Sequence, residues 1–358
     1  MSHKKALRRF LLLSLLASFF VISLLLSIVI FGIINFNIPI STPAFFHLAS
    51  FSLRSKLWLI LLFFAIISVS YLSNKTIFRE IIKDLRWLRL THYFLMLILG
   101  IVIAEKYSAT TPSLSNNLLI VNILLAVISM TLAALFCIIT NNIVDQDIDR
   151  LSNQSRPLIT GNISFNTYLT IGIAAALLAL VYAIAINLNA LLIISTIMVT
   201  YSLYSLPPLR FKRIPVVSKL VISGNSLVII LLGYLLQHHN LQQFPLILVP
   251  LFLIGFTLSI NFIDLKDFHG DSAAGIKTIP VLIGTRNAAL VIGVAFFLTY
   301  LSFYFFIKTM ACLPFLLCLG ILQFFCINKK NYDERWVFLI YISSMVGLVL
   351  WLEWFAKI

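Results

Sequence analysis

The chain has 358 residues, of which 61% are hydrophobic and only 11% are charged, and its formal net charge is +14. Its mean hydropathy is +1.05, and a soluble core could not enclose that much apolar surface, so the composition indicates a polytopic membrane protein. The positive charge does not indicate a nucleic-acid partner, because the basic residues are distributed as membrane topology requires.

Eleven apolar segments reach the roughly 20 residues needed to cross a bilayer as a helix. The first follows a basic cluster at residues 4–9 and is too long for the apolar stretch of a signal peptide, so we expect it to remain as an anchor. The predicted spans begin near Phe10, Leu57, Leu90, Leu118, Tyr168, Ala190, Ser218, Pro245, Ala288, Cys312 and Trp336.

The basic residues also predict an orientation. If the N-terminus lies in the cytoplasm, cytoplasmic segments hold 21 of the 26 Lys and Arg residues, as the positive-inside rule requires. The other side keeps Arg54, Lys56, Lys106, Lys308 and Lys357. The sequence therefore predicts an integral multi-pass protein of the cell inner membrane or its equivalent, with the N-terminus and the polar loops in the cytoplasm.

Six of the eight aspartates fall in two short clusters near predicted span ends. Asn141, Asp145 and Asp149 are spaced i, i+4, i+8, which places them on one stripe of a helix. Asp147 points away from that stripe and is expected to be a solvated residue. Carboxylates concentrated in such apolar sequence need a cationic partner, and a hard divalent metal suits them.

The second cluster repeats this pattern. Asp264, Asp267 and Asp271 are spaced i, i+3, i+7, and four predicted spans separate them from the first cluster, so both are expected at the cytoplasmic face. Arg156 follows the first cluster and Lys277 the second. We therefore expect a site for a polyanion bridged by Mg²⁺, with Arg156 and Lys277 on the phosphate oxygens.

Three segments resemble signatures of the UbiA family of intramembrane prenyltransferases. They are NNIVDQDIDRLSNQSRPLITG with the first cluster, DLKDFHGDSAAGIKTIPVLIG with the second, and YSLPPLRFKR between them. The chain departs from the family pattern in two places: Asn142 stands where most members have Asp, and Arg89 and Leu90 stand where the first core span usually begins with Arg-Pro.

The resemblance implies an all-α fold, a bundle of nine membrane helices around a central cavity, in residues 79–358. Residues 1–78 would be an extension with two further membrane helices. The implied activity is Mg²⁺-dependent transfer of a prenyl group from an isoprenoid diphosphate to a small hydrophobic or aromatic acceptor, by ionisation of the allylic diphosphate. Asp145, Asp149, Asp264, Asp267 and Asp271 would be the catalytic metal ligands, and the substrate would contact Asn141, Arg156, Tyr204, Arg210, Lys212 and Lys277.

Two other classes of membrane protein use intramembrane aspartates. A secondary transporter would place them near the bilayer midplane in two inverted halves, whereas these clusters lie at span ends. A CDP-alcohol phosphotransferase would hold its aspartates in one continuous signature, whereas these clusters begin at Asp145 and Asp264. Both remain as alternatives, and the sequence does not specify an oligomeric state.

Overall fold

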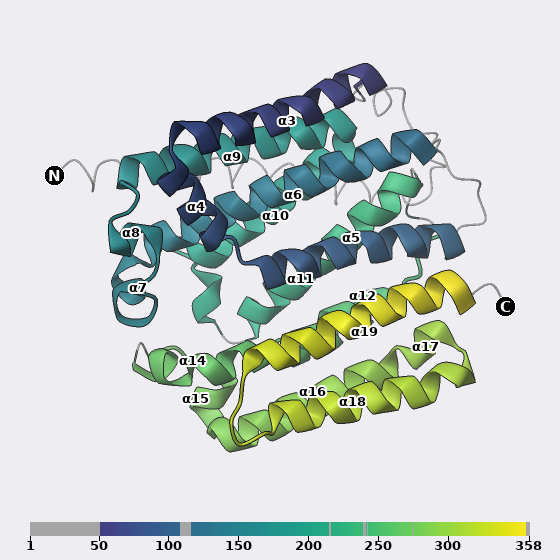
Figure 1. Cartoon of the computed structure of the whole chain (residues 1–358). Coiled ribbons are helices and arrows are strands. Elements are labelled where there is room, and N and C mark those ends of the chain that lie inside the picture. Colours follow the sequence, from purple (N-terminus) through teal and green to yellow (C-terminus); the bar gives the residue numbers. More distant parts are fainter. Residues whose placement is uncertain are drawn as a thin grey trace. The chain divides into compact units, whose positions relative to one another are not determined.

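The computed structural model describes residues 51–107, 116–214, 216–238, 241, 243–273 and 275–355, and the regular structure among them is entirely helical (Figure 1). Nine of these helices are long and apolar enough to cross a membrane, and a tenth candidate is a pair of helices bent by 45°. This confirms the predicted all-α, multi-pass membrane architecture. The predicted span that begins near Phe10 lies outside the described residues, and the other ten each have a helical counterpart.

The chain divides into two compact units, and the first consists of residues up to Arg86 and from Leu114 to Arg210. Its helices are α3 (Leu53–Ser73), α4 (Lys75–Asp84), α6 (Asn116–Val144), α7 (Gln146–Ser152), α8 (Pro157–Thr160), α9 (Phe165–Ile186) and α10 (Leu188–Ser205). Helices α6 and α9 pack along each other, and α10 contacts both (Figure 1).

Side-chain caps set the starts of several helices in the first unit. The side chains of Asn74, Ser164 and Asn187 accept hydrogen bonds from backbone N–H groups in the first turns of α4, α9 and α10. The short α4 is amphipathic: Ile81 is buried, whereas Arg79 and Lys83 are exposed. The predicted basic cytoplasmic loop after α3 therefore contains a helix that packs one face against its own unit.

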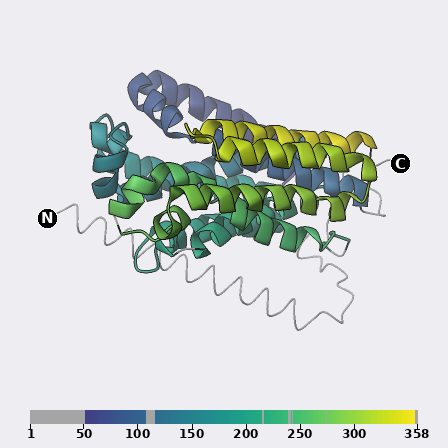
Figure 2. The ribbon, with the colours of Figure 1, turned by 90° about the horizontal axis from the view of Figure 1, so that it is seen from below.

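The second unit consists of residues 87–113 and residues from Phe211 onward. Its described elements are α5 (Trp87–Tyr107), η1 (Phe211–Arg213), α11 (Val217–Gln237), α12 (Leu248–Pro250), the π-helix η2 (Leu251–Phe256), α13 (Thr257–Ser259), α14 (Phe262–Ala273), α15 (Ile279–Ile283), α16 (Thr285–Ser302), α17 (Tyr304–Ile307), η3 (Met310–Cys312), α18 (Leu313–Ile327) and α19 (Glu334–Phe355). Helix α18 contacts both α16 and α19, and Figure 2 shows these green and yellow helices side by side.

Glycines allow α5 and α11 to approach closely. A Cβ atom on Gly100 would lie 2.0 Å from the Ile230 carbonyl oxygen, and one on Gly233 would lie 2.1 Å from the Leu97 carbonyl oxygen. Membrane helices commonly pack through small residues in this way, because apolar side chains gain little by leaving lipid.

A buried histidine links three helices of the second unit. The His92 ring on α5 shares hydrogen bonds with the Ser226 hydroxyl on α11 (2.9 Å) and the Tyr341 hydroxyl on α19 (2.7 Å). It also stacks on Phe256, with ring centroids 5.1 Å apart, at the end of the π-helical turn. Both ring nitrogens thus have polar partners inside an apolar bundle.

Candidate active site

The first aspartate cluster lies where α6 passes into α7. Asp145 interrupts the assigned helix, yet its N–H donates to the Asn141 carbonyl (2.9 Å) and its carbonyl accepts from the Asp149 N–H (2.8 Å). Helical spacing therefore continues through the break, and Asn141, Asp145 and Asp149 follow one stripe. Asp145 and Asp149 are buried, whereas the Asp147 side chain is 98% exposed.

Arg210 supplies a positive charge to this cluster. Its Nη2 donates to Asp145 Oδ1 at 2.7 Å, across a gap of 65 residues in sequence. The Arg210 backbone is left-handed (φ 44°), a conformation that costs a non-glycine residue roughly 1 kcal/mol or more. Its Nε is buried without an acceptor among the described residues, so Arg210 retains a donor for a further anion.

Asp149 has a buried carboxylate oxygen without a hydrogen-bond partner among the described residues. Its Oδ1 accepts from Asn153 Nδ2 at 3.0 Å, while its Oδ2 is buried and meets no donor in the described part of the chain. Burial raises the pKa of the Asp149 carboxyl, and the Asn153 hydrogen bond and the Arg156 charge oppose that shift. A cation placed against Oδ2 would compensate the buried charge.

Arg156, predicted to bind phosphate, begins α8 and has an acidic partner that the sequence did not reveal. Its Nη1 donates to Asp84 Oδ1 at 2.7 Å. Asp84 Oδ2 accepts from Asn142 Nδ2 at 2.8 Å and from the Tyr168 hydroxyl. This contact gives a physical reason for Asn142 at a position where most family members have Asp. The Asn142 amide donates to Asp84, whereas a carboxylate at that position would repel it.

Two further predicted residues of the first unit are Asn141 and Tyr204. Ser205, at the end of α10, donates to Asn141 Oδ1 at 3.2 Å. Tyr204 is half-buried, and its ring centroid lies 5.3 Å from that of Tyr201. The Asn141 side chain is thus held by Ser205, the residue that follows Tyr204 in the segment YSLPPLRFKR.

The second aspartate cluster lies on α14, just after the 45° bend. Asp264 is buried, Asp271 is half-buried and Asp267 is exposed, and a single helix holds all three at the predicted spacing. At the bend, Asn261 Nδ2 donates to the Thr257 carbonyl (2.8 Å) and the Leu258 carbonyl (3.0 Å). These bonds satisfy carbonyls that the interrupted helix leaves without a backbone donor.

Lys219 provides the positive charge of the second unit's site. Its Nζ donates to Asp264 Oδ1 at 2.5 Å, and both side chains are 10% exposed. The predicted phosphate ligand Lys277 is exposed between α14 and α15, and Lys212 is half-buried in η1. The sequence placed Lys219 only among the topological charges, and no motif marked it as a partner of Asp264.

The donors present suit a hard cation that shares its ligands with a polyanion. Within the described ranges, no three His, Cys, Asp or Glu side chains are grouped as they are around a fully protein-bound metal. Mg²⁺ usually takes only one or two carboxylates and completes its octahedron with water and phosphate oxygens. Asp149 Oδ2, which no donor of the described residues contacts, is an oxygen ligand of that kind.

Comparison with known families and proteins gives concordant findings. A sequence profile described as the UbiA prenyltransferase family matches residues 93–346. The chain is 25% identical over 192 residues to 2-acylphloroglucinol 4-prenyltransferase of Humulus lupulus (50% of this chain, 46% of that protein). It is 31% identical over 156 residues to homogentisate phytyltransferase of Synechocystis (41% of this chain, 50% of that protein). The chain spans about half the length of these curated relatives.

Solved structures share the fold. A UbiA homologue from Archaeoglobus fulgidus, solved with GPP and Mg²⁺, matches with a TM-score of 0.59 at 22% identity, covering 76% of this chain and 99% of that chain. A UbiA homologue from Aeropyrum pernix in its apo form matches with a TM-score of 0.57 at 17% identity, covering 74% and 98%. At these identities the similarity establishes the fold alone.

Proposed function

Because this chain belongs to the UbiA prenyltransferase family, we propose that it transfers a prenyl group from an isoprenoid diphosphate to a small aromatic or lipid-like acceptor within the membrane. We assign the catalytic domain to residues 79–358, which include the whole of the profile match at residues 93–346. We assign residues 1–78, which include α3 and the first four residues of α4, to an extension of that domain. The proposed reaction requires Mg²⁺.

The observation that supports this function most directly is the pairing of two buried aspartates with basic side chains, one of them half-buried (Arg210) and one buried (Lys219). Asp145 pairs with Arg210 in one unit, and Asp264 pairs with Lys219 in the other. Such pairs suit a substrate that carries its own counterions, because the basic side chains can bind phosphate oxygens while the carboxylates bind Mg²⁺. An isoprenoid diphosphate has phosphate oxygens that can bind both basic side chains and Mg²⁺. Its apolar tail is compatible with a bundle of apolar helices.

The chemistry follows from where charge develops. As the allylic C–O bond breaks, negative charge grows on the leaving diphosphate, and groups aimed at that charge stabilise the transition state more than the ground state. Arg156, Arg210, Lys219 and Lys277 are assigned to the diphosphate oxygens. The carboxylates of Asp145, Asp149, Asp264, Asp267 and Asp271 would hold Mg²⁺, which would further neutralise the charge on the leaving group. Asn141, Tyr204 and Lys212 are assigned to further contacts with the substrate.

The proposal is tested by product formation. Membranes that contain the full chain are incubated with a panel of prenyl diphosphates and acceptors, with Mg²⁺ or with excess chelator, and products are identified by mass. We expect a prenylated acceptor that depends on both Mg²⁺ and the chain. Undiminished product in chelator, or equal product from membranes that lack the chain, would refute the assignment.

The acceptor panel needs two chemical classes. Relatives are named for aromatic acceptors, as in homogentisate phytyltransferase, and for a lipid acceptor, as in digeranylgeranylglyceryl phosphate synthase of Methanothrix thermoacetophila (32% identical over 170 residues). Phenolic acids, acylated phenols and prenylated glycerol phosphates therefore belong in the first panel.

A further inference from the structure

Asp84 is a buried acid without an assigned role in the proposed reaction. It is the last residue of α4, and its side chain is only 2% exposed. Three donors from three other segments surround it: Arg156 at the start of α8, Asn142 on α6 and Tyr168 on α9. A carboxylate that is fully enclosed by donors has a fixed orientation.

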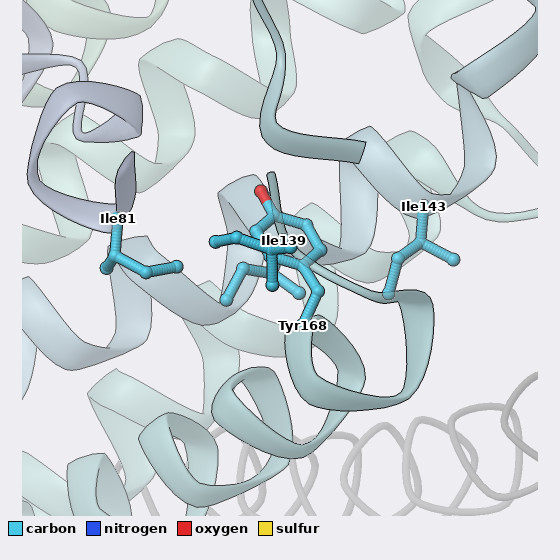
Figure 3. Close-up of a cluster of buried hydrophobic side chains, with 5 residues drawn as sticks. Ile81, Ile139, Ile143 and Tyr168 are labelled. Atoms are coloured by element: carbon cyan, nitrogen blue, oxygen red, sulfur yellow. The ribbon is translucent and has the colours of Figure 1, made fainter. Parts of the chain in front are cut away.

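The support beneath this network is apolar and closely packed. The Tyr168 ring lies in a cluster with Ile81, Ile139, Ile143 and Ile163, all of which are less than a tenth exposed (Figure 3). The ring is held by this cluster while its hydroxyl reaches Asp84. Neither the ring nor the carboxylate can move without disturbing α4, α6 and α9 together.

Arg156 is held differently from its partner. One of its terminal nitrogens is bound to Asp84, its side chain is 18% exposed, and its charge acts on Asp149. A guanidinium has five N–H donors in a rigid planar fork, so fixing one nitrogen sets the direction of the others.

We propose that Asp84 is a positioning residue that holds the Arg156 guanidinium in the orientation in which its remaining N–H groups meet the diphosphate. This inference rests on the proposed function, because it needs Arg156 to contact the donor substrate. Asp84 itself does not touch the substrate. It acts by removing the rotational freedom that Arg156 would otherwise lose on binding.

The test measures binding of inorganic pyrophosphate with Mg²⁺ to the purified full-length protein in detergent, together with its unfolding temperature without ligand. Asp84→Asn removes the charge and keeps the size of the side chain. We expect pyrophosphate affinity to fall by about tenfold, roughly the effect of one charge-assisted hydrogen bond. In the Arg156→Gln background, Asp84→Asn should cause no further loss. Glu80→Gln is the matched control, because it removes a carboxylate on the same helix whose partners, Lys83 and Asn162, are both exposed and lie outside the Asp84 network.

Several outcomes would overturn the inference. If Asp84→Asn lowers the unfolding temperature but leaves the pyrophosphate affinity unchanged, Asp84 only stabilises the fold. Losses that add to those of Arg156→Gln would show that Asp84 acts independently of Arg156. If the parent protein itself fails to bind pyrophosphate with Mg²⁺, the proposed function fails together with this inference.

A less disruptive substitution tests the inference if the Asp84→Asn variant does not fold. Tyr168→Phe removes one donor to Asp84 and leaves its charge, Arg156 and the apolar cluster in place. We expect a loss of affinity of about two- to fivefold, a fraction of one hydrogen bond's effect, that disappears in the Arg156→Gln background. An unchanged affinity in Tyr168→Phe would contradict the proposed positioning.

Discussion

At the scale of single residues, the first aspartate cluster contains an exposed carboxylate that serves as a control for two buried ones. Asp145 and Asp149 are buried, whereas the Asp147 side chain is 98% exposed and lies 3.9 Å from Arg150. Asp145→Asn or Asp149→Asn should lower turnover by about 10²- to 10³-fold, the usual effect of removing one group that stabilises developing charge. Asp147→Asn should stay within about twofold, as surface substitutions usually do. Initial rates are compared at equal protein content, and an Asp147 variant as inactive as Asp145→Asn would contradict the assignment.

The same residues show what the sequence could predict about the candidate site. Clustering and helical spacing made the aspartate stripes visible, and the structure keeps both spacings within their units. Asp84 and Lys219 gave no such signal, because each stands alone in sequence and meets its partner 72 and 45 residues away. Pairing of that kind is set by helix packing, which a local pattern does not encode.

At the scale of elements, the contact between α5 and α11 predicts opposite effects for two glycines of one helix. A Cβ on Gly233 would meet the Leu97 carbonyl at 2.1 Å, whereas a Cβ on Gly224 would meet nothing within 4 Å. Alanine is favoured over glycine within a helix by about 1 kcal/mol, so Gly224→Ala should be neutral or stabilising. Gly233→Ala should destabilise by about 1–3 kcal/mol, because two backbones must separate. Thermal unfolding in detergent measures both, and equal effects would mean that the helices are not in close contact.

The elements also mark the limit of sequence reasoning about this fold. Apolar length predicted ten spans that have counterparts among the described helices. The bend before α14 was not predicted, because no proline or glycine lies between Ser259 and Phe262, and Asn261 instead ends the helix with its side chain. Helix α4 was missed as well, since its ten residues are too short and too charged to stand out beside membrane spans.

At the scale of the whole molecule, the charge distribution predicts sidedness. Single cysteines at Ser155 and Ser272 should react with a membrane-impermeant thiol reagent from the cytoplasmic face only, and one at Thr309 from the opposite face only. All three positions are exposed. The native cysteines must first be replaced, because Cys318 is exposed and Cys326 is partly exposed. Labelling of Ser272 and Thr309 from one face would overturn the predicted orientation.

The buried hydrogen bonds of His92 also have a consequence for synthesis of the chain, because both partners are translated long after His92. Its partner Ser226 lies 134 residues later in the chain, and its partner Tyr341 lies 249 residues later. At roughly 5–20 residues per second, His92 would be synthesised about 7–27 s before Ser226. During that interval, a polar imidazole and the bare glycine face of α5 would be exposed to lipid or held by the insertion machinery. The order of synthesis thus leaves α5 without its α11 partner during that interval, and the second unit can pack completely only after the residues up to Arg210 have been translated.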